Sequence, residues 1–122
     1  MEKLTGLCVL LAALSLAVTE DKFFTESGSL TLDVSPPYPE PIQIIVWKFR
    51  GDLLAEWVED QVPVEFSHSF NGRTTLDIKT GRLVINSMSK NDTGVYSVEI
   101  NNNVQSVSYT AKWIKSVPQP RE

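Results

Sequence analysis

The stretch "NDTGVYSVEI", Asn91 to Ile100, decides how this sequence is interpreted. In it Tyr96 and Val98 alternate with the polar residues Ser97 and Glu99. A period of two with one polar face indicates a strand buried on one side. Just before the strand stand an aspartate and a glycine, so the order is Asp-x-Gly-x-Tyr-x-Val.

This order differs by one residue from a known signature. Asp-x-Gly-x-Tyr followed two residues later by cysteine is typical of strand F in immunoglobulin domains, where the cysteine bonds to strand B and packs on a core tryptophan. Here Val98 stands at that cysteine position. The partner position in "GSLTLDV" is Val34, and Trp47 follows 13 residues later. Both cysteine positions are valine, so the replacement is paired, and the valines can pack on Trp47 without a bond.

Two further features of the signature predict structural contacts. Tyr96 is expected to be the tyrosine of the corner, its hydroxyl bonding to backbone in the preceding loop. Arg73 precedes another short strand and Asp92 precedes the signature strand. We predict that these two residues form a bidentate ion pair at the bottom of the domain. The alternative is that they are two unrelated surface charges.

The remaining chain indicates short strands separated by turns. "SPPYPEP" is too rich in proline for a helix or a central strand, whereas "IQIIVWKF" suits a central strand. "LLAEWVED" has helical propensity, but it follows a tight turn after a strong strand, so a strand is preferred. "VEFSHSF" is predicted as another strand. About nine strands predict an all-β fold, an immunoglobulin V-type β-sandwich that lacks the inter-sheet disulfide.

The two ends are expected to lie outside this fold. Residues 1–19 have a lysine, an apolar run and then small residues, which predicts a secretory signal peptide cleaved after Ala17 or Thr19. Residues 20–115 are the predicted domain, and 116–122 a proline-rich linker or tail. The single cysteine, Cys8, falls in the signal. We expect an extracellular location, and a membrane role only through a segment absent from this chain.

Composition and side-chain types argue against several functions. The net charge of −4 gives no basic patch for nucleic acid, and a mildly acidic surface could favour a basic partner. His68 is the only histidine, so no cysteine and histidine metal cluster is expected. Ser67 and Ser69 flank it on a predicted strand, where neighbours point to opposite faces. We therefore expect no enzyme, cofactor, metal or small-molecule substrate.

At these motifs the chain resembles the first domain of SLAM-family leukocyte adhesion receptors, especially the members that act as ligands. The resemblance covers about Ile45 to Ile100 and rests on "WKF", "LAEW", "FNGRTTLDIKTGRLVI" and "KNDTGVYSVEI". It implies a cysteine-free core in this domain. It also implies adhesion between cells, by binding a related immunoglobulin-like receptor, homophilic or heterophilic, through one sheet.

Alternation along the strands predicts which residues face a partner. With Trp47 and Val98 pointing inward, we expect Lys48, Arg50, Glu56 and Glu99 to point outward, with Asn101 on the rim. Such a mixed, charged face suits weak, salt-sensitive recognition. The alternative is a solvated face with internal salt bridges.

Three other features leave alternatives open. Trp57 is either a local core residue or an exposed aromatic anchor. Arg50–Asp52 spells Arg-Gly-Asp, which is expected to be a chance match to an integrin motif. Asn91 begins an N-glycosylation sequon. For the whole chain, the main hypothesis is a cell-surface adhesion domain, and the alternative is a secreted immune modulator or decoy.

Overall fold

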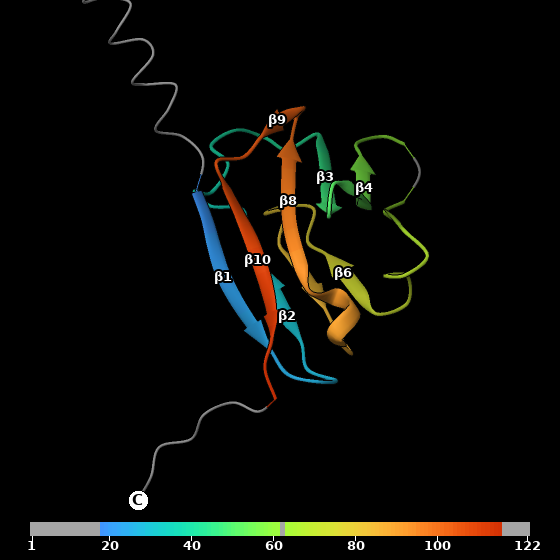
Figure 1. Ribbon diagram of the computed structural model, residues 1–122. Helices are drawn as coiled ribbons and strands as arrows, with labels where there is room; N and C mark the ends of the chain where they lie inside the picture. Colours follow the sequence, from blue (N-terminus) through green and yellow to red (C-terminus); the bar gives the residue numbers. More distant parts are fainter. Residues whose placement is uncertain (1–17, 62, 116–122) are drawn as a thin grey trace, which may run out of the picture.

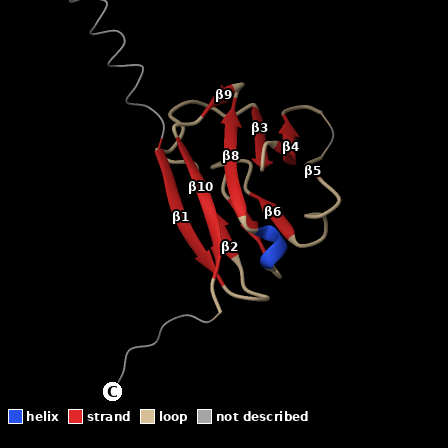
Figure 2. Ribbon diagram, viewed as in Figure 1, coloured by secondary structure: helices blue, strands red, loops and turns tan. Residues whose placement is uncertain are grey.

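The computed structural model describes residues 18–61 and 63–115, and these form two facing β-sheets (Figures 1 and 2). The larger sheet is seven-stranded, with the order β1-β10-β8-β3-β4-β5 and β9 paired to β8. The smaller sheet is three-stranded, with the order β2-β7-β6. All pairings are antiparallel except β1 with β10, which is parallel.

Most strands are short. In chain order they are β1 (Val18–Phe24), β2 (Leu30–Leu32), β3 (Ile44–Phe49), β4 (Asp52–Val58), β5 (Glu65–Phe66), β6 (Thr74–Leu76), β7 (Leu83–Ile85), β8 (Gly94–Ile100), β9 (Asn103–Val104) and β10 (Val107–Trp113). A single 3₁₀ turn, η1 (Lys90–Asp92), leads into β8. The described residues contain no α-helix, and therefore none that could span a membrane.

The turns follow from local sequence. Between β3 and β4, Arg50 and Gly51 have φ values of 54° and 86°. Between β8 and β9, Asn101 and Asn102 have φ values of 50° and 70°. Two consecutive positive φ values are what a two-residue hairpin turn requires, and glycine and asparagine tolerate them. These turns fix the register of the hairpins.

The core centres on Trp47, which is fully buried, as is Ile45 on the same face of β3. Trp47 lies opposite Val98 on the inner face, and Val34 is buried with 6% of its surface exposed. The indole of Trp47 donates a hydrogen bond of 2.8 Å to the carbonyl of Gly81. A Cβ on Gly81 would lie 2.6 Å from Val34, so only glycine fits here. Apolar packing and one buried hydrogen bond therefore occupy the place of the disulfide.

The fold class is the predicted one. β4 and β5 extend the sheet of β10, β8 and β3, as in a variable-type immunoglobulin domain. The described residues include no cysteine. The molecule is therefore an all-β immunoglobulin V-type sandwich whose two sheets are held together without a disulfide.

Several local predictions are corrected. "LLAEWVED" is strand β4, as preferred, but "VEFSHSF" is a strand only at Glu65 and Phe66. The chain then turns, because Phe70 and Asn71 donate their backbone N–H groups to the carbonyl of Ser67. His68 and its serine neighbours therefore lie in a turn. Strand β1 begins at Val18, two residues before the predicted domain boundary; the other signal and tail residues, 1–17 and 116–122, lie outside the described part.

Candidate functional site

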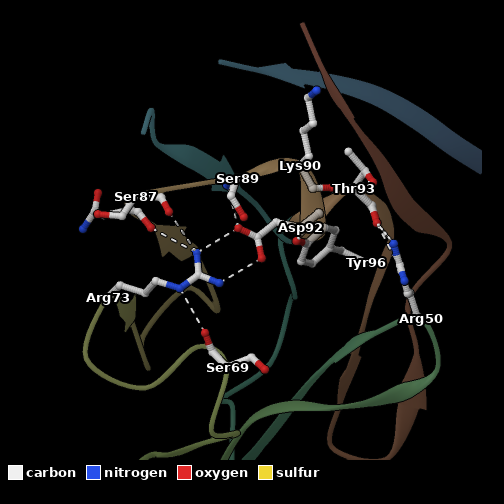
Figure 3. A network of polar contacts seen from close by, with 10 residues as sticks. Arg50, Ser69, Arg73, Ser87, Ser89, Lys90, Asp92, Thr93 and Tyr96 are labelled. Carbon is white, nitrogen blue, oxygen red and sulfur yellow. Dashed lines mark hydrogen bonds and ion pairs between the residues drawn. The ribbon is translucent and has the colours of Figure 1, made fainter. Parts of the chain in front are cut away.

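The lower corner of the domain is closed by an ion pair (Figure 3). Arg73 donates to both carboxylate oxygens of Asp92, at 3.0 and 2.8 Å. The same guanidinium donates to the carbonyl of Ser69, and Asp92 also accepts from the backbone N–H of Ser89. Asp92 is only 5% exposed, so these contacts satisfy a buried charge. The structure thus brings together the pair that the sequence placed here.

Tyr96 fixes the start of β8 against this corner. Its hydroxyl donates a 2.7 Å hydrogen bond to the carbonyl of Asp92, four residues earlier. Its ring packs 4.7 Å from that of Phe49, measured between centroids. Burial, and secondly the charge of Asp92, raises the pKa of the Tyr96 hydroxyl well above its usual range. Tyr96 is therefore a buried, protonated donor with a structural role.

The outer face of the larger sheet carries the charged residues that the sequence singled out. Val46 of β3 pairs with Glu56 of β4 on one side and with Glu99 of β8 on the other. Glu56 pairs in turn with Glu65 of β5. Residues paired across antiparallel strands point to the same face. Three glutamates and Val46 therefore form one row across four strands, which we call the acidic row.

One cation borders the acidic row. Lys48 lies two residues from Val46 on β3, and its Nζ is 2.9 Å from Oε2 of Glu99. Its side chain is 37% exposed and that of Glu99 is 27% exposed. The sequence left open the alternative that this face has internal salt bridges, and Glu99 forms one with Lys48. Glu56 and Glu65 remain on the row without an ion-pair partner among the described residues.

A shallow groove lies beside the two glutamates. It has a volume of about 330 Å³ and its lining includes Glu56, Glu65, Val58 and Pro63. Like charges directly opposite one another on neighbouring strands destabilise a sheet. An apolar wall beside two carboxylates suits the stem and head of a basic side chain. Sequence reasoning missed Glu65, because the register of so short a strand is set only by tertiary pairing.

Arg50 faces out but is already engaged. It occupies the turn after β3, and its Nε and Nη2 donate to the carbonyl of Thr93 at 3.1 and 2.6 Å. Its guanidinium also lies 5.0 Å from the centre of the Phe49 ring. The head group of Arg50, predicted as a partner-contact residue, therefore ties the β3–β4 turn to the start of β8. The Arg-Gly-Asp motif accordingly has a bound arginine.

Asn101, predicted as a rim contact, has a structural role. Its side-chain oxygen accepts from the backbone N–H groups of Gln43 and Ile44, at 2.7 and 3.0 Å. Its amide nitrogen donates to the carbonyl of Pro41 at 3.1 Å. All three partners of the Asn101 side chain are backbone groups of the segment that leads into β3. The adjacent Asn102 is exposed and is the residue that the loop presents to solvent.

The structure also shows where Trp57 and the sequon asparagine lie. Trp57 pairs with the inward residue Ile45 and packs against the core, so it is a local core residue. Asn91 is exposed on η1, at the opposite end of β8 from Glu99. The described residues hold no cluster of side chains suited to a metal ion.

Comparison with known proteins finds a relative by sequence. No family model matches the chain. The human CD48 antigen is 30% identical over an alignment of 122 positions, and the match covers 92% of this chain and 50% of that protein. The chain therefore spans about half the length of the curated relative it matches. It is related to CD48 by sequence.

Solved structures agree at the level of the fold. The first immunoglobulin-like domain of human CD48 has a TM-score of 0.72 and 22% identity, covering 87% of this chain and 90% of that one. The CD2-binding domain of CD58, lymphocyte function-associated antigen 3, has a TM-score of 0.70 and 22% identity, covering 80% and 55%. The chain is thus an immunoglobulin-like domain, as its sequence predicted, and it is related by sequence to the CD48 antigen.

Proposed function

We propose that this chain is the recognition domain of a SLAM-family adhesion protein, which binds an immunoglobulin-like receptor on another leukocyte. The acidic row carries this proposal. It lies on the outer face of the larger sheet, where Glu56 and Glu65 have no cationic partner among the described residues. The sequence relationship to CD48 supports a cell-surface recognition role. The name of the CD58 structure, a CD2-binding domain, supports a receptor as the partner.

The chemistry of the row specifies the partner surface. The row contributes three negative charges, and the neighbouring Lys48 is paired with Glu99. A second copy of the same face would present the same excess of negative charge. Like charges brought together cost several kcal/mol, whereas a basic surface is attracted and steered. We therefore propose heterophilic binding to a basic surface.

An extracellular location follows from the same proposal. The sequence pattern of residues 1–19 is that of a secretory signal. Adhesion between cells also requires that the outer face be presented outside the cell. The weak, reversible contacts expected of charged faces suit repeated contact between moving cells.

Charge reversal on the acidic row tests this function. Glu56→Lys should weaken binding to an ectodomain panel of SLAM-type receptors at least tenfold, about 1.4 kcal/mol, since it removes one attraction and adds one repulsion. Surface plasmon resonance at two salt concentrations measures it. Binding of the unaltered protein should fall as salt increases.

The matched control adds the same charge elsewhere. Thr31 and Thr75 are exposed on the smaller sheet, so Thr31→Lys with Thr75→Lys also adds two positive charges. This double variant should bind as the unaltered protein does. Equal affinity of the control and the Glu56→Lys variant, with both proteins folded, would place the contact surface elsewhere.

A further inference from the structure

The sequon Asn91–Asp92–Thr93 includes two residues, Asp92 and Thr93, of the bonded corner shown in Figure 3. Asn91 is exposed, and none of the side-chain hydrogen bonds of the described residues involves it. Its two sequon neighbours are both engaged. Asp92 is bound by Arg73 and by the N–H of Ser89, as described above.

Thr93 is held at both of its oxygen atoms. Its hydroxyl donates to the carbonyl of Lys90 at 2.9 Å. Its own carbonyl accepts both hydrogen bonds from Arg50. The backbone between Lys90 and Asp92 is a 3₁₀ turn, whose carbonyl of Lys90 also accepts from the N–H of Thr93. The folded sequon is thus compact and internally bonded.

We propose that Asn91 carries an N-linked glycan, and that the glycan is transferred before this corner folds. Glycosylation of this kind requires both the asparagine and the hydroxyl residue of the sequon. In the folded domain only the asparagine is available. In an unfolded chain newly entering the secretory pathway, both are available.

The transfer itself needs an activated sugar donor, a lipid-linked oligosaccharide diphosphate. The amide nitrogen of Asn91 forms a bond to the anomeric carbon of the first sugar and gives up one proton to a carboxylate base of the transferase. The bond from that carbon to the donor's phosphate breaks, and the lipid diphosphate leaves. No group of the folded domain takes part, so the product depends only on access to the sequon.

Folding and transfer therefore compete for the same segment. Once Arg73 binds Asp92 and Tyr96 binds the carbonyl of Asp92, re-extending the sequon breaks all these bonds together. Breaking a buried ion pair is costly. We expect secreted molecules to be a mixture, some with the glycan and some without it.

The position of Asn91 makes a glycan compatible with recognition. Glu99 is five residues beyond Gly94, the first residue of β8, so at about 3.4 Å per residue it lies roughly 17 Å from the end of the strand that follows η1. A sugar at Asn91 extends from the lower end of the sandwich, while the acidic row crosses its outer face. Loss of the glycan should leave partner binding unchanged, which makes this inference independent of the proposed function.

Mass spectrometry of the full chain secreted from mammalian cells tests the site. N-glycosidase treatment should reduce the mass of the secreted protein and convert Asn91 to aspartate in the modified molecules. Asn91→Gln and Thr93→Val should both abolish the glycan. An unmodified Asn91 in all secreted molecules would overturn the assignment.

A variant of the corner tests the order of events. Arg73→Gln removes the ion pair, so occupancy of Asn91 should rise from partial toward complete. Arg82→Gln is the control, because it breaks an exposed ion pair with Asp33 at 2.6 Å and leaves the corner intact. Complete occupancy of the unaltered protein, or equal partial occupancy in all three, would refute the competition.

A second measurement covers the case in which Arg73→Gln is not secreted. Folded, unglycosylated protein produced in bacteria is offered to detergent-permeabilised microsomes that contain the transferase and its sugar donor, beside a peptide spanning residues 86–97. The peptide should be modified and the folded protein should not. Equal modification of the two would show that the folded corner does not protect the sequon.

Discussion

Buried single residues supply the stability that a disulfide supplies in many small extracellular domains. Trp47 hydrogen-bonds to Gly81 and lies beside Val98, and Val34 fills the space that a side chain on Gly81 would need. Thr74 is the exception among these buried residues. It is 7% exposed, and its hydroxyl has no hydrogen-bond partner. An unsatisfied buried hydroxyl costs free energy.

Replacing this threonine should therefore stabilise the domain. Thr74→Val keeps the shape of the side chain and removes the unsatisfied hydroxyl. We expect the free energy of unfolding in urea to increase by about 1 kcal/mol. Thr75→Val is the control, because Thr75 is its exposed neighbour on the same strand. A gain of equal size in both variants would attribute the effect to strand propensity.

At the scale of elements, turns and side chains together determine which strands meet. The β8–β9 turn positions Asn101 so that its amide binds the backbone of the segment entering β3. The sequence has three consecutive asparagines here. It did not distinguish the asparagine that joins two strands from its exposed neighbour, because that difference depends on contacts with residues about 60 positions away.

A comparison of the two asparagines measures this role. Both have positive φ, so glycine substitution relieves the same backbone restriction at each site. Asn101→Gly should lower the free energy of unfolding by about 2 kcal/mol, since three hydrogen bonds to backbone groups are lost. Asn102→Gly should be neutral or slightly stabilising. Equal effects in urea denaturation would contradict a specific role for Asn101.

Very short strands are predicted less accurately from sequence patterns than long ones. β4 and β8 have seven residues each and were predicted from alternation or context. β5 has two residues, and the pattern "VEFSHSF" predicted a strand that was too long. A two-residue strand exists only because a neighbouring edge, here β4, pairs with it. Strand β1 was not predicted, and one reason is that its first residues lie in the predicted signal sequence.

At the scale of the whole molecule, packing of the sheets buries ionisable tyrosines. Tyr96 and Tyr109 are 0% and 3% exposed, and burial raises the pKa of both hydroxyl groups. The ordinary tyrosine pKa is about 10. Above that pH the unfolded chain loses these protons while the folded domain keeps them. The unfolded state is then favoured, so stability should be lost as the pH rises.

Denaturation in urea between pH 7 and 11 checks this expectation. The free energy of unfolding should fall above pH 10, by up to about 1.4 kcal/mol per pH unit for each tyrosine. Tyr96→Phe should give a lower starting stability, because it loses the bond to Asp92, and a shallower decline. The same slope in both proteins would exclude Tyr96 as a cause of the alkaline loss.

The sequence by itself determined the fold class, the inward residues Val34, Trp47 and Val98, and the pairing of Arg73 with Asp92. The alternation of apolar and polar residues along a strand, and the spacing of residues in the signature, depend on local backbone geometry. Both can therefore be recognised in the sequence alone. Only the tertiary structure decided that Arg50 and Asn101 are internally bonded, that Lys48 binds Glu99, and that Glu56 lies beside Glu65. Those contacts depend on register between strands that are distant in the sequence, and register is set by the packing of the whole domain.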